Sequence, residues 1–260
     1  MHEPLFESTI EGAIDIRIQN VEKRDLLMSK ANHSYTISPI AYIHTDLPTK
    51  FGCPRQSGLV TTLEARIVFE PTYRDPVAFR GMDGYTHLWL IWGFSENKRN
   101  TWASTVKPPR LGGNKRMGVF ATRSPYRPNS LGLSSVKLER MELDEKLGPV
   151  LVVTGADLMD GTPIYDVKPY LPFTDSHPDA KGGFADEFTD YGLEVNFPEN
   201  WLQMIPEEKR EGLFGILSQD PRPSYIDDPE RVYGFNFLEF DVRFTVKDNV
   251  ITVCEIEKLK

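Results

Sequence analysis

Hydrophobic and polar residues alternate along several short runs of the chain, which are bounded by Gly, Pro and Asp. In one run Ala65 and Ile67 alternate with Glu64 and Arg66. A period of two residues places neighbouring side chains on opposite faces of a strand and is typical of half-buried strands. The pattern predicts strands over residues 36–44, 59–69, 86–94, 117–122, 132–139 and 150–157.

Long helical patterns are absent between these runs, which argues against a parallel sheet with crossover helices. A mainly β fold built around a closed or nearly closed antiparallel barrel is the economical solution. We expect this barrel domain to span residues 35–176. Residues 1–34 follow neither the helical nor the strand period, and we expect an N-terminal extension of unknown role.

The pattern changes after residue 176, where an acidic loop is followed by helical periodicity and then by strands. The predicted helix has Leu213 and Leu217 on one face, with Phe214 beside them, and Pro206 opens its regular part. We expect a small α+β domain over residues 177–260. Its predicted elements are a helix over 199–217 and a β-hairpin with strands over 235–246 and 250–256.

Composition is that of an ordinary globular protein, with 260 residues, 40% hydrophobic and 26% charged. The formal net charge of −8 by itself argues against a nucleic-acid binder. The charge is unevenly distributed, however: residues 98–140 carry +9, whereas residues 1–97 carry −3 and residues 141–260 carry −14. Such an asymmetry indicates an anionic partner, and the alternative is a solvated loop with surplus basic residues.

Several kinds of site are not supported by the sequence. Cys53 and Cys254 form neither a disulfide framework nor a zinc motif, and the five histidines lack metal-ligand spacing, so we expect no metal. Glycine-rich nucleotide-binding motifs are also missing. With no apolar run long enough for a bilayer and no visible secretory signal, we expect a soluble cytoplasmic protein without membrane contact.

An arginine-rich run over residues 118–132 carries the most specific chemistry. It places Arg123 and Arg127 beside Pro125 and Pro128, directly after an apolar stretch. Guanidinium groups bind anionic oxygens in a two-pronged geometry, and prolines restrict the loop that holds them. A purely structural turn would not need both arginines, which favours anion binding. The alternative is that the run has only a structural role.

A second run, over residues 155–172, combines aspartates with Lys168 and Tyr170 in a strand–turn–strand pattern. A carboxylate there could accept hydrogen bonds from ribose hydroxyls or take up a proton. The turn at residues 160–163 is by itself only a turn signal, so Asp160 has capping of that turn as its alternative role. A third run, over residues 52–58, is too short to interpret alone.

Together these runs resemble the TrmO family, also described as TsaA-like or YaeB-like. The resemblance extends in order from residue 35 to residue 176 and continues at residues 219–225 and 241–244. It implies an S-adenosylmethionine-dependent β-barrel enzyme that methylates N6 of N6-threonylcarbamoyladenosine beside the anticodon of tRNA. It also implies a homodimer with the cofactor near the subunit interface.

The same resemblance implies site residues at matching positions. The cofactor pocket is expected to include Pro54, Arg55, Gln56, Phe94, Ser95, Arg123, Leu133, Thr154, Gly155, Ala156 and Asp157. The catalytic residues are expected to be Asp160, Asp166, Lys168 and Tyr170, with the two aspartates as candidate bases, and the tRNA-binding residues Lys115, Arg116, Arg127, Asn129 and Arg222. His87 is interpreted as a strand core residue rather than a base.

Two other functions fit the same sequence features. One is a noncatalytic RNA-binding barrel that uses the basic segment for phosphates. The other is a methyltransferase for a small metabolite, in which the basic segment plays no part in substrate binding.

Overall fold

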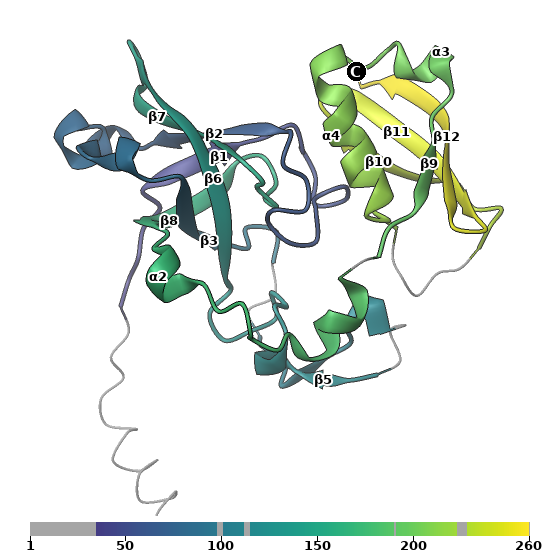
Figure 1. The fold of residues 1–260 in the computed structure, drawn as a ribbon, viewed down its shortest axis with the longest axis horizontal. Coiled ribbons are helices and arrows are strands. Elements are labelled where there is room, and N and C mark those ends of the chain that lie inside the picture. Colours follow the sequence, from purple (N-terminus) through teal and green to yellow (C-terminus); the bar gives the residue numbers. More distant parts are fainter. Residues whose placement is uncertain (1–34, 98–100, 112–114, 190, 223–227, 260) are drawn as a thin grey trace, which may run out of the picture. The chain divides into compact units, whose positions relative to one another are not determined.

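The computed structural model describes residues 35–97, 101–111, 115–189, 191–222 and 228–259 (Figure 1). The expected extension over residues 1–34 lies outside this part of the chain. Contacts divide the chain into two compact units, residues 1–38 and 39–260. In the first unit only residues 35–38 are described, and they have no regular secondary structure. The second unit carries all the elements discussed below.

Six antiparallel strands close into a barrel in the order β1-β2-β7-β6-β3-β8 (Figure 1). The mainly β barrel expected from the alternating pattern is therefore confirmed. The strands are β1 (Ala41–His44), β2 (Glu64–Phe69), β3 (His87–Gly93), β6 (Leu131–Asp144), β7 (Gly148–Thr154) and β8 (Thr162–Pro169). The barrel interior is filled by aliphatic and aromatic side chains from all six strands, including Ile43, Ile67, Leu90, Val136, Leu151 and Ile164.

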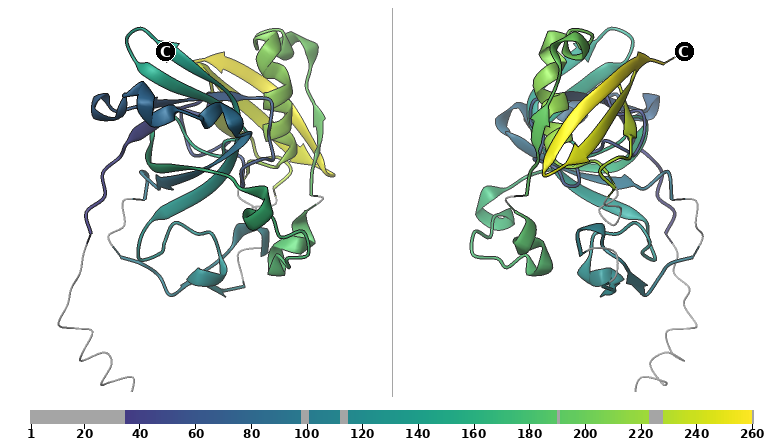
Figure 2. Two further views of the ribbon diagram at one scale, coloured as in Figure 1. Left: turned by 60° about the vertical axis from the view of Figure 1, so that its left-hand side comes forward. Right: turned by 90° about the vertical axis from the view of Figure 1, so that its right-hand side faces the viewer.

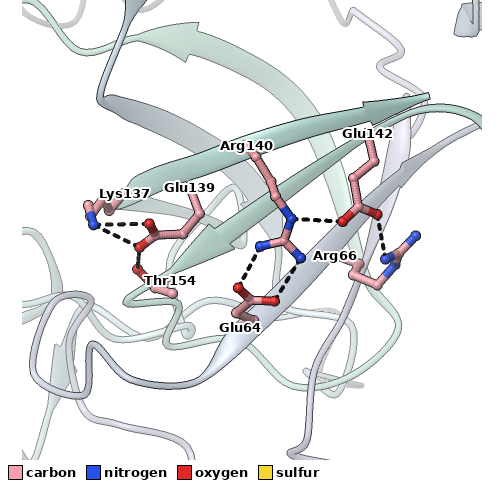
Figure 3. A network of polar contacts seen from close by, with 7 residues as sticks. All are labelled: Glu64, Arg66, Lys137, Glu139, Arg140, Glu142 and Thr154. Carbon is pink, nitrogen blue, oxygen red and sulfur yellow. Dashed lines mark hydrogen bonds and ion pairs between the residues drawn. The ribbon is translucent and has the colours of Figure 1, made fainter. Parts of the chain in front are cut away.

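Strand β7 is buried on both of its faces. Leu151 and Val153 belong to the barrel core, and Val150 and Val152 on the opposite face are also fully buried. Long charged side chains from the two neighbouring strands cover that outer face (Figure 3). Their aliphatic stems exclude water from the valines while the charged ends remain at the surface.

Arg140 on β6 is at the centre of this charged layer. It forms a bidentate ion pair with Glu64 on β2, at 2.6 and 3.0 Å, and donates a hydrogen bond to Glu142 at 2.8 Å. Glu142 also pairs with Arg66 at 2.7 Å (Figure 3). The ion pairs thus join β2 to β6 across the intervening β7.

The described parts of the connection from β3 to β6 contain little regular structure. Two short strands, β4 (Thr105–Val106) and β5 (Met117–Gly118), pair antiparallel within it. The strand expected over residues 117–122 was wrong beyond Gly118, because Val119–Ala121 form a 3-10 turn. The Thr122 hydroxyl donates to the Val119 carbonyl at 2.9 Å and closes this turn.

The C-terminal part contains a four-stranded sheet with the order β10-β11-β12-β9. Helix α4 packs against one face of it, as both views in Figure 2 show. The elements are β9 (Glu194–Asn196), α3 (Glu199–Leu202), α4 (Glu207–Ser218), β10 (Tyr233–Phe237), β11 (Phe240–Lys247) and β12 (Val250–Lys258). Outside this sheet are α2 (Pro172–Asp175) and 3-10 turns at Pro71–Tyr73, Pro76–Phe79, Met82–Gly84, Pro109–Leu111 and Gly183–Phe188.

Two expected elements in this part are interrupted. The helix predicted over 199–217 divides into α3 and α4 before Pro206, because proline has no amide hydrogen and disfavours a helical conformation of the preceding residue. The strand predicted over 235–246 breaks at Leu238, which has a positive φ of 52°. The Leu238 amide donates to the Asp46 carbonyl at 2.8 Å, so a contact with the barrel domain accompanies this break.

The loop between β1 and β2 completes the C-terminal core. Leu47 and Val60 from this loop are buried in the same cluster as α4 and the C-terminal sheet. Lys209 on α4 also pairs with Asp46 in the loop at 2.5 Å. The loop that carries residues 52–58 is therefore held by the C-terminal elements.

Candidate functional site

A cavity of about 600 Å³ opens beside the end of β3. Its wall combines segments that are far apart in the sequence: the loop after β1, the end of β3, the loop before β6, and the turn after β7. Of the residues expected to contact the cofactor, Pro54, Arg55, Gln56, Phe94, Ser95, Arg123, Leu133 and Asp157 line this cavity. Its size falls within the range of small-molecule binding sites.

A buried hydrogen-bond relay runs into the cavity wall. The Trp92 indole donates to the Ser134 hydroxyl at 2.9 Å, and Ser134 donates to Asp157 at 2.6 Å. Since the indole N–H can only donate, the serine oxygen accepts from it and the serine proton goes to the carboxylate. Ser134 is 1% exposed, so this relay fixes the orientation of Asp157.

Burial dominates the electrostatics of the Asp157 carboxylate. Desolvation raises its pKa above the ordinary value, while the hydrogen bond from Ser134 acts in the opposite direction. The neighbouring thiol of Cys53 has its pKa raised to about 12 by burial and by the Asp157 charge. Burial and the neighbouring charge thus favour the neutral thiol of Cys53.

Aromatic rings form another part of the wall. The rings of Trp92 and Phe94 lie 4.4 Å apart between centroids, at an angle of 59°. Gly132 on the paired strand has no side chain where the Trp92 indole lies, and a Cβ at that position would overlap the ring. This glycine thus permits the close approach that places the indole in the cavity wall.

The two arginines of the arginine-rich run both line the cavity. Arg123 donates a hydrogen bond to the Gln56 side chain, which joins two expected cofactor residues from different loops. Arg127 donates to the Thr122 carbonyl at 2.9 Å through Nη1, which braces its own loop. The guanidinium of Arg127 therefore has a local structural contact as well as a place in the wall.

Arg55 connects the cavity to the C-terminal part of the chain. Its guanidinium donates to the backbone carbonyls of Asp220 and Arg222 at 3.1 and 2.9 Å. Asp220 is buried and accepts hydrogen bonds from Arg222 at 2.9 Å and from the Tyr191 hydroxyl at 2.7 Å. Arg222, expected to bind tRNA, is placed in this internal ion pair with 13% of its side chain exposed.

Three of the four expected catalytic residues are on or just after β8, next to a residue of the cavity wall. Lys168 is opposite Trp89 in the antiparallel register, so both side chains point to the same face. Lys168 pairs with Asp166 at 2.8 Å. The Tyr170 ring lies 5.5 Å from that of Trp89. Trp89 itself lines the cavity, whereas Asp166, Lys168 and Tyr170 are not part of its wall.

Asp160, the fourth expected catalytic residue, does not line the cavity either. Its carboxylate accepts a hydrogen bond from the Thr45 amide at 3.0 Å and contacts His44 Nδ1 at 3.2 Å. These contacts tie the turn before β8 to the loop after β1. The arrangement resembles a turn-capping role more than a position against a ligand.

The remaining expected residues also lie away from the cavity wall. Thr154 donates to Glu139 on the outer face of the barrel at 2.7 Å, and Ala156 packs against the barrel core. Gly155, with φ +80°, accepts a hydrogen bond from the Gly58 amide at 2.9 Å. Lys115 and Arg116 are exposed near β5, and the Asn129 carbonyl accepts from Leu131.

Sequence reasoning missed Trp92 and Ser134, whose connection to Asp157 depends on strand pairing across the barrel. The expectation of a core position for His87 was wrong. His87 is the first residue of β3 and is exposed, with its Nδ1 3.0 Å from the Thr86 hydroxyl. His87 is on the outer face of β3, because the next residue, Leu88, points into the barrel core.

Within the described residues, no three His, Cys, Asp or Glu side chains are grouped to hold a metal ion. Nor does that part of the chain include a helix with the length and apolar character needed to cross a bilayer.

Comparison with known families assigns both parts of the chain. Residues 42–176 match the tRNA-methyltransferase O N-terminal domain, and residues 191–259 match the TrmO C-terminal domain. This chain belongs to the TrmO family. The resemblance inferred from the motifs is thereby confirmed.

Relatives of this TrmO-family chain include a "tRNA (adenine(37)-N6)-methyltransferase" of Escherichia coli K12, 39% identical over 232 residues, which are 86% of this chain and 98% of the relative. A protein of the same description from Eikenella corrodens is 44% identical over 65% of this chain and 95% of its own length. A crystal structure of TrmO from Pseudomonas aeruginosa superposes with a TM-score of 0.71 and 31% identity, covering 88% of this chain and 99% of that one.

Proposed function

We propose that this TrmO-family chain is a tRNA adenine N6-methyltransferase that uses S-adenosylmethionine and acts on N6-threonylcarbamoyladenosine beside the anticodon. One observation carries the proposal. Eight of the eleven residues expected to contact the cofactor line a single cavity of about 600 Å³, although they come from five separate segments. The relatives described as tRNA (adenine(37)-N6)-methyltransferases support the same activity.

The cavity wall fits a cationic cofactor with an aromatic base. Asp157 supplies a buried negative charge to oppose a sulfonium or ammonium group, and the Trp92 and Phe94 rings supply faces for stacking. When bound there, S-adenosylmethionine supplies an electrophilic methyl group. Arg55, Gln56 and Asp157 would hold it.

The residues beside Trp89 are assigned to the substrate. N6 of the carbamoylated adenosine is a poor nucleophile that retains a proton, so the protein must position it and accept that proton. Asp166 takes the proton, and Lys168 and Arg127 bind the threonyl carboxylate. Tyr170 packs on Trp89 and supports the adenine-facing wall.

Asp160 is assigned a different role by its contacts. Its Oδ1 accepts a hydrogen bond from the Thr45 amide and contacts His44 Nδ1, which joins the turn before β8 to the end of β1. We infer that Asp160 holds the turn preceding β8, and through it the start of the strand that carries Asp166 and Lys168.

A homodimer is part of the proposal. Leu131 and Leu133 begin β6 beside the cavity with 37% and 55% of their surface exposed. A second copy that covers these leucines would also close the cavity mouth from water, as transfer of a methyl group favours. Sedimentation of the purified chain tests this point, and a monomer with full activity contradicts it.

Several further assignments complete the proposal. The barrel domain over residues 35–176 carries the chemistry, and the domain over 177–260 supports its cofactor loop. No metal takes part, so activity persists in the presence of a chelator. The protein acts in the cytoplasm, where its tRNA substrate is found.

Mass spectrometry of tRNA nucleosides tests the activity directly. The purified chain is incubated with S-adenosylmethionine and with tRNA that carries threonylcarbamoyladenosine, and we expect the methylated nucleoside to accumulate. Matched tRNA without the threonylcarbamoyl group serves as the control. Tight binding of tRNA without methyl transfer favours a noncatalytic RNA-binding barrel. Methyl transfer only to a small molecule favours a methyltransferase for a small metabolite.

A further inference from the structure

Two large aromatic side chains lie exposed next to each other in the connection between β3 and β6. Trp102 is 53% exposed and Phe120 is 73% exposed. Their rings are nearly parallel, with an interplanar angle of 24° and centroids 6.3 Å apart. Burial in a core does not explain this pair, because both rings present most of their surface to solvent. An exposed pair of large apolar rings indicates a contact surface.

The backbone around the pair is held in place. Ala103, next to Trp102, donates to the Tyr126 carbonyl at 3.0 Å, and Val119, next to Phe120, donates to the Ser104 carbonyl at 3.0 Å. The paired strands β4 and β5 lie between the two aromatic residues in the sequence. The rings therefore project from a braced hairpin, so that a ligand can contact them at a low cost in conformational entropy.

The charge around the pair favours a polyanion. Residues 97–138 contain no Asp or Glu, and they include the basic residues that give the segment its positive charge. Lys115 and Arg116 are exposed immediately before β5. Aromatic rings within a basic surface are typical of single-stranded nucleic-acid binding, in which phosphates contact the cations and bases stack on the rings.

The same segment reaches the cavity. Phe120 is followed by Thr122 and Arg123, both of which line the cavity wall, and the partner of Ala103, Tyr126, lines it as well. A base that enters the cavity must leave the stack of its anticodon loop, and its neighbour then loses a stacking partner. An aromatic surface close to the cavity can replace that lost contact.

The geometry points to the Trp102–Phe120 pair as a stacking platform for an unstacked base of the tRNA, adjacent to the nucleotide that enters the cavity. The inference rests on the proposed function and extends it by assigning a second contact with the RNA. A second copy of the chain is the competing occupant of this apolar surface. The absence of carboxylates over residues 97–138 disfavours it, because two such positively charged surfaces repel each other.

Fluorescence anisotropy with a labelled anticodon stem–loop that carries threonylcarbamoyladenosine tests the platform without requiring turnover. We expect Trp102→Ala and Phe120→Ala each to weaken RNA binding about tenfold. Trp102→Phe and Phe120→Tyr preserve a ring and should bind within about twofold of the unchanged protein. Tyr73→Ala removes another exposed ring, in the turn Pro71–Tyr73, and should have no effect.

Salt dependence separates stacking from phosphate contacts. Loss of a ring should weaken binding equally at low and high salt, so the slope of log affinity against log salt stays constant. Lys115→Gln should instead reduce that slope by about one. Calorimetry with S-adenosylmethionine should give the same affinity for both alanine variants as for the unchanged chain, which excludes damage to the cavity.

Three results overturn the inference. Alanine variants that bind the stem–loop normally exclude a stacking role, even if the unchanged chain methylates tRNA as proposed. Alanine variants that alter the sedimentation coefficient and leave RNA affinity unchanged assign the pair to contact between copies. A reduced salt slope in the alanine variants, with wild-type affinity at high salt, assigns their effect to phosphate contacts.

If the unchanged chain fails to methylate tRNA but its RNA binding depends on the rings, the proposed activity fails and the platform stands.

Discussion

Arg55 of the cavity wall donates a hydrogen bond at 2.9 Å to the backbone carbonyl of Arg222, in the C-terminal part of the chain. A second bond, to the carbonyl of Asp220, measures 3.1 Å. The loop that carries Arg55 is thus held from the C-terminal side, while its neighbour Gln56 is held by Arg123 from the arginine-rich run. The C-terminal elements therefore stabilise one wall of the cavity.

Replacement of Arg55 tests this support. Arg55→Ala removes two charge-assisted hydrogen bonds, and we expect it to lower the free energy of unfolding by about 2 kcal/mol. The affinity for S-adenosylmethionine should fall as well, because the wall loses its bracing. Denaturant titration and calorimetry measure the two effects, with Lys181→Ala as an exposed control. An unchanged unfolding free energy in Arg55→Ala would show that the two bonds do not support the loop.

The relay from Ser134 controls the charge of Asp157. Burial raises the pKa of Asp157, and loss of the Ser134 hydrogen bond should raise it further. Cofactor affinity should therefore fall as the pH drops through this raised pKa, and in Ser134→Ala the fall should begin at a higher pH. Asp157→Asn should bind weakly at every pH. Titration calorimetry over a range of pH gives these profiles, and superimposable profiles for the unchanged chain and Ser134→Ala would contradict the relay.

Asp157→Asn is expected to affect folding stability differently from cofactor binding. A carboxyl whose pKa is raised in the folded state costs stability as the pH rises through the unfolded and then the folded pKa. Asp157→Asn should therefore match or exceed the unchanged chain in Tm at neutral pH, even though it binds the cofactor poorly. A marked loss of Tm in this variant would mean that Asp157 has a structural role.

The charged layer over β7 predicts an acid-dependent loss of stability. Hydrogen bonding to Arg140 holds the pKa of Glu64 and of Glu142 below the ordinary value. Their contribution is complete above the unfolded pKa and is lost as the pH falls through the lowered folded pKa. Glu64→Gln should flatten the decline of Tm between about pH 5 and pH 3, whereas Glu187→Gln at an exposed position should leave it unchanged.

Substitution of two aspartates distinguishes the proposed base, Asp166, from the proposed structural residue, Asp160. Asp166→Asn should reduce kcat about a hundredfold or more and leave cofactor affinity unchanged, because a positioned base contributes at least that much. Asp160→Asn should lower the free energy of unfolding by about 1 kcal/mol and have a small effect on kcat. Single-turnover methylation and denaturant titration measure both quantities. The reverse pattern would assign the proton transfer to Asp160.

Arg127 is expected to provide selectivity for the modified base. Arg127→Ala should lower kcat/KM for tRNA with threonylcarbamoyladenosine more than for tRNA without it. The substitution removes a guanidinium that can bind the threonyl carboxylate in a bidentate geometry. Arg127→Lys should restore only part of the difference, because an ammonium group lacks the planar fork. Equal losses on both RNAs would mean that Arg127 only braces its loop through Thr122.

The sequence by itself determined the barrel, because alternation such as that of Ala65 and Ile67 with their charged neighbours reflects a local property of strands. It also determined the family, because the motifs are contiguous. The short β5 shows the limits of this pattern, since the 3-10 turn that ends the strand is closed by a hydrogen bond that alternation does not reveal.

Only the tertiary structure decided which motif residues meet. Asp157 and Asp160 are three positions apart, yet one lines the cavity beside Ser134 and the other binds the Thr45 amide. Ser134 enters the site through the register of β6, and Arg222 forms an internal ion pair with Asp220 in which its side chain is mostly covered. Closure of the barrel and packing of the C-terminal elements set these long-range contacts, and neither leaves a periodic signal in the sequence.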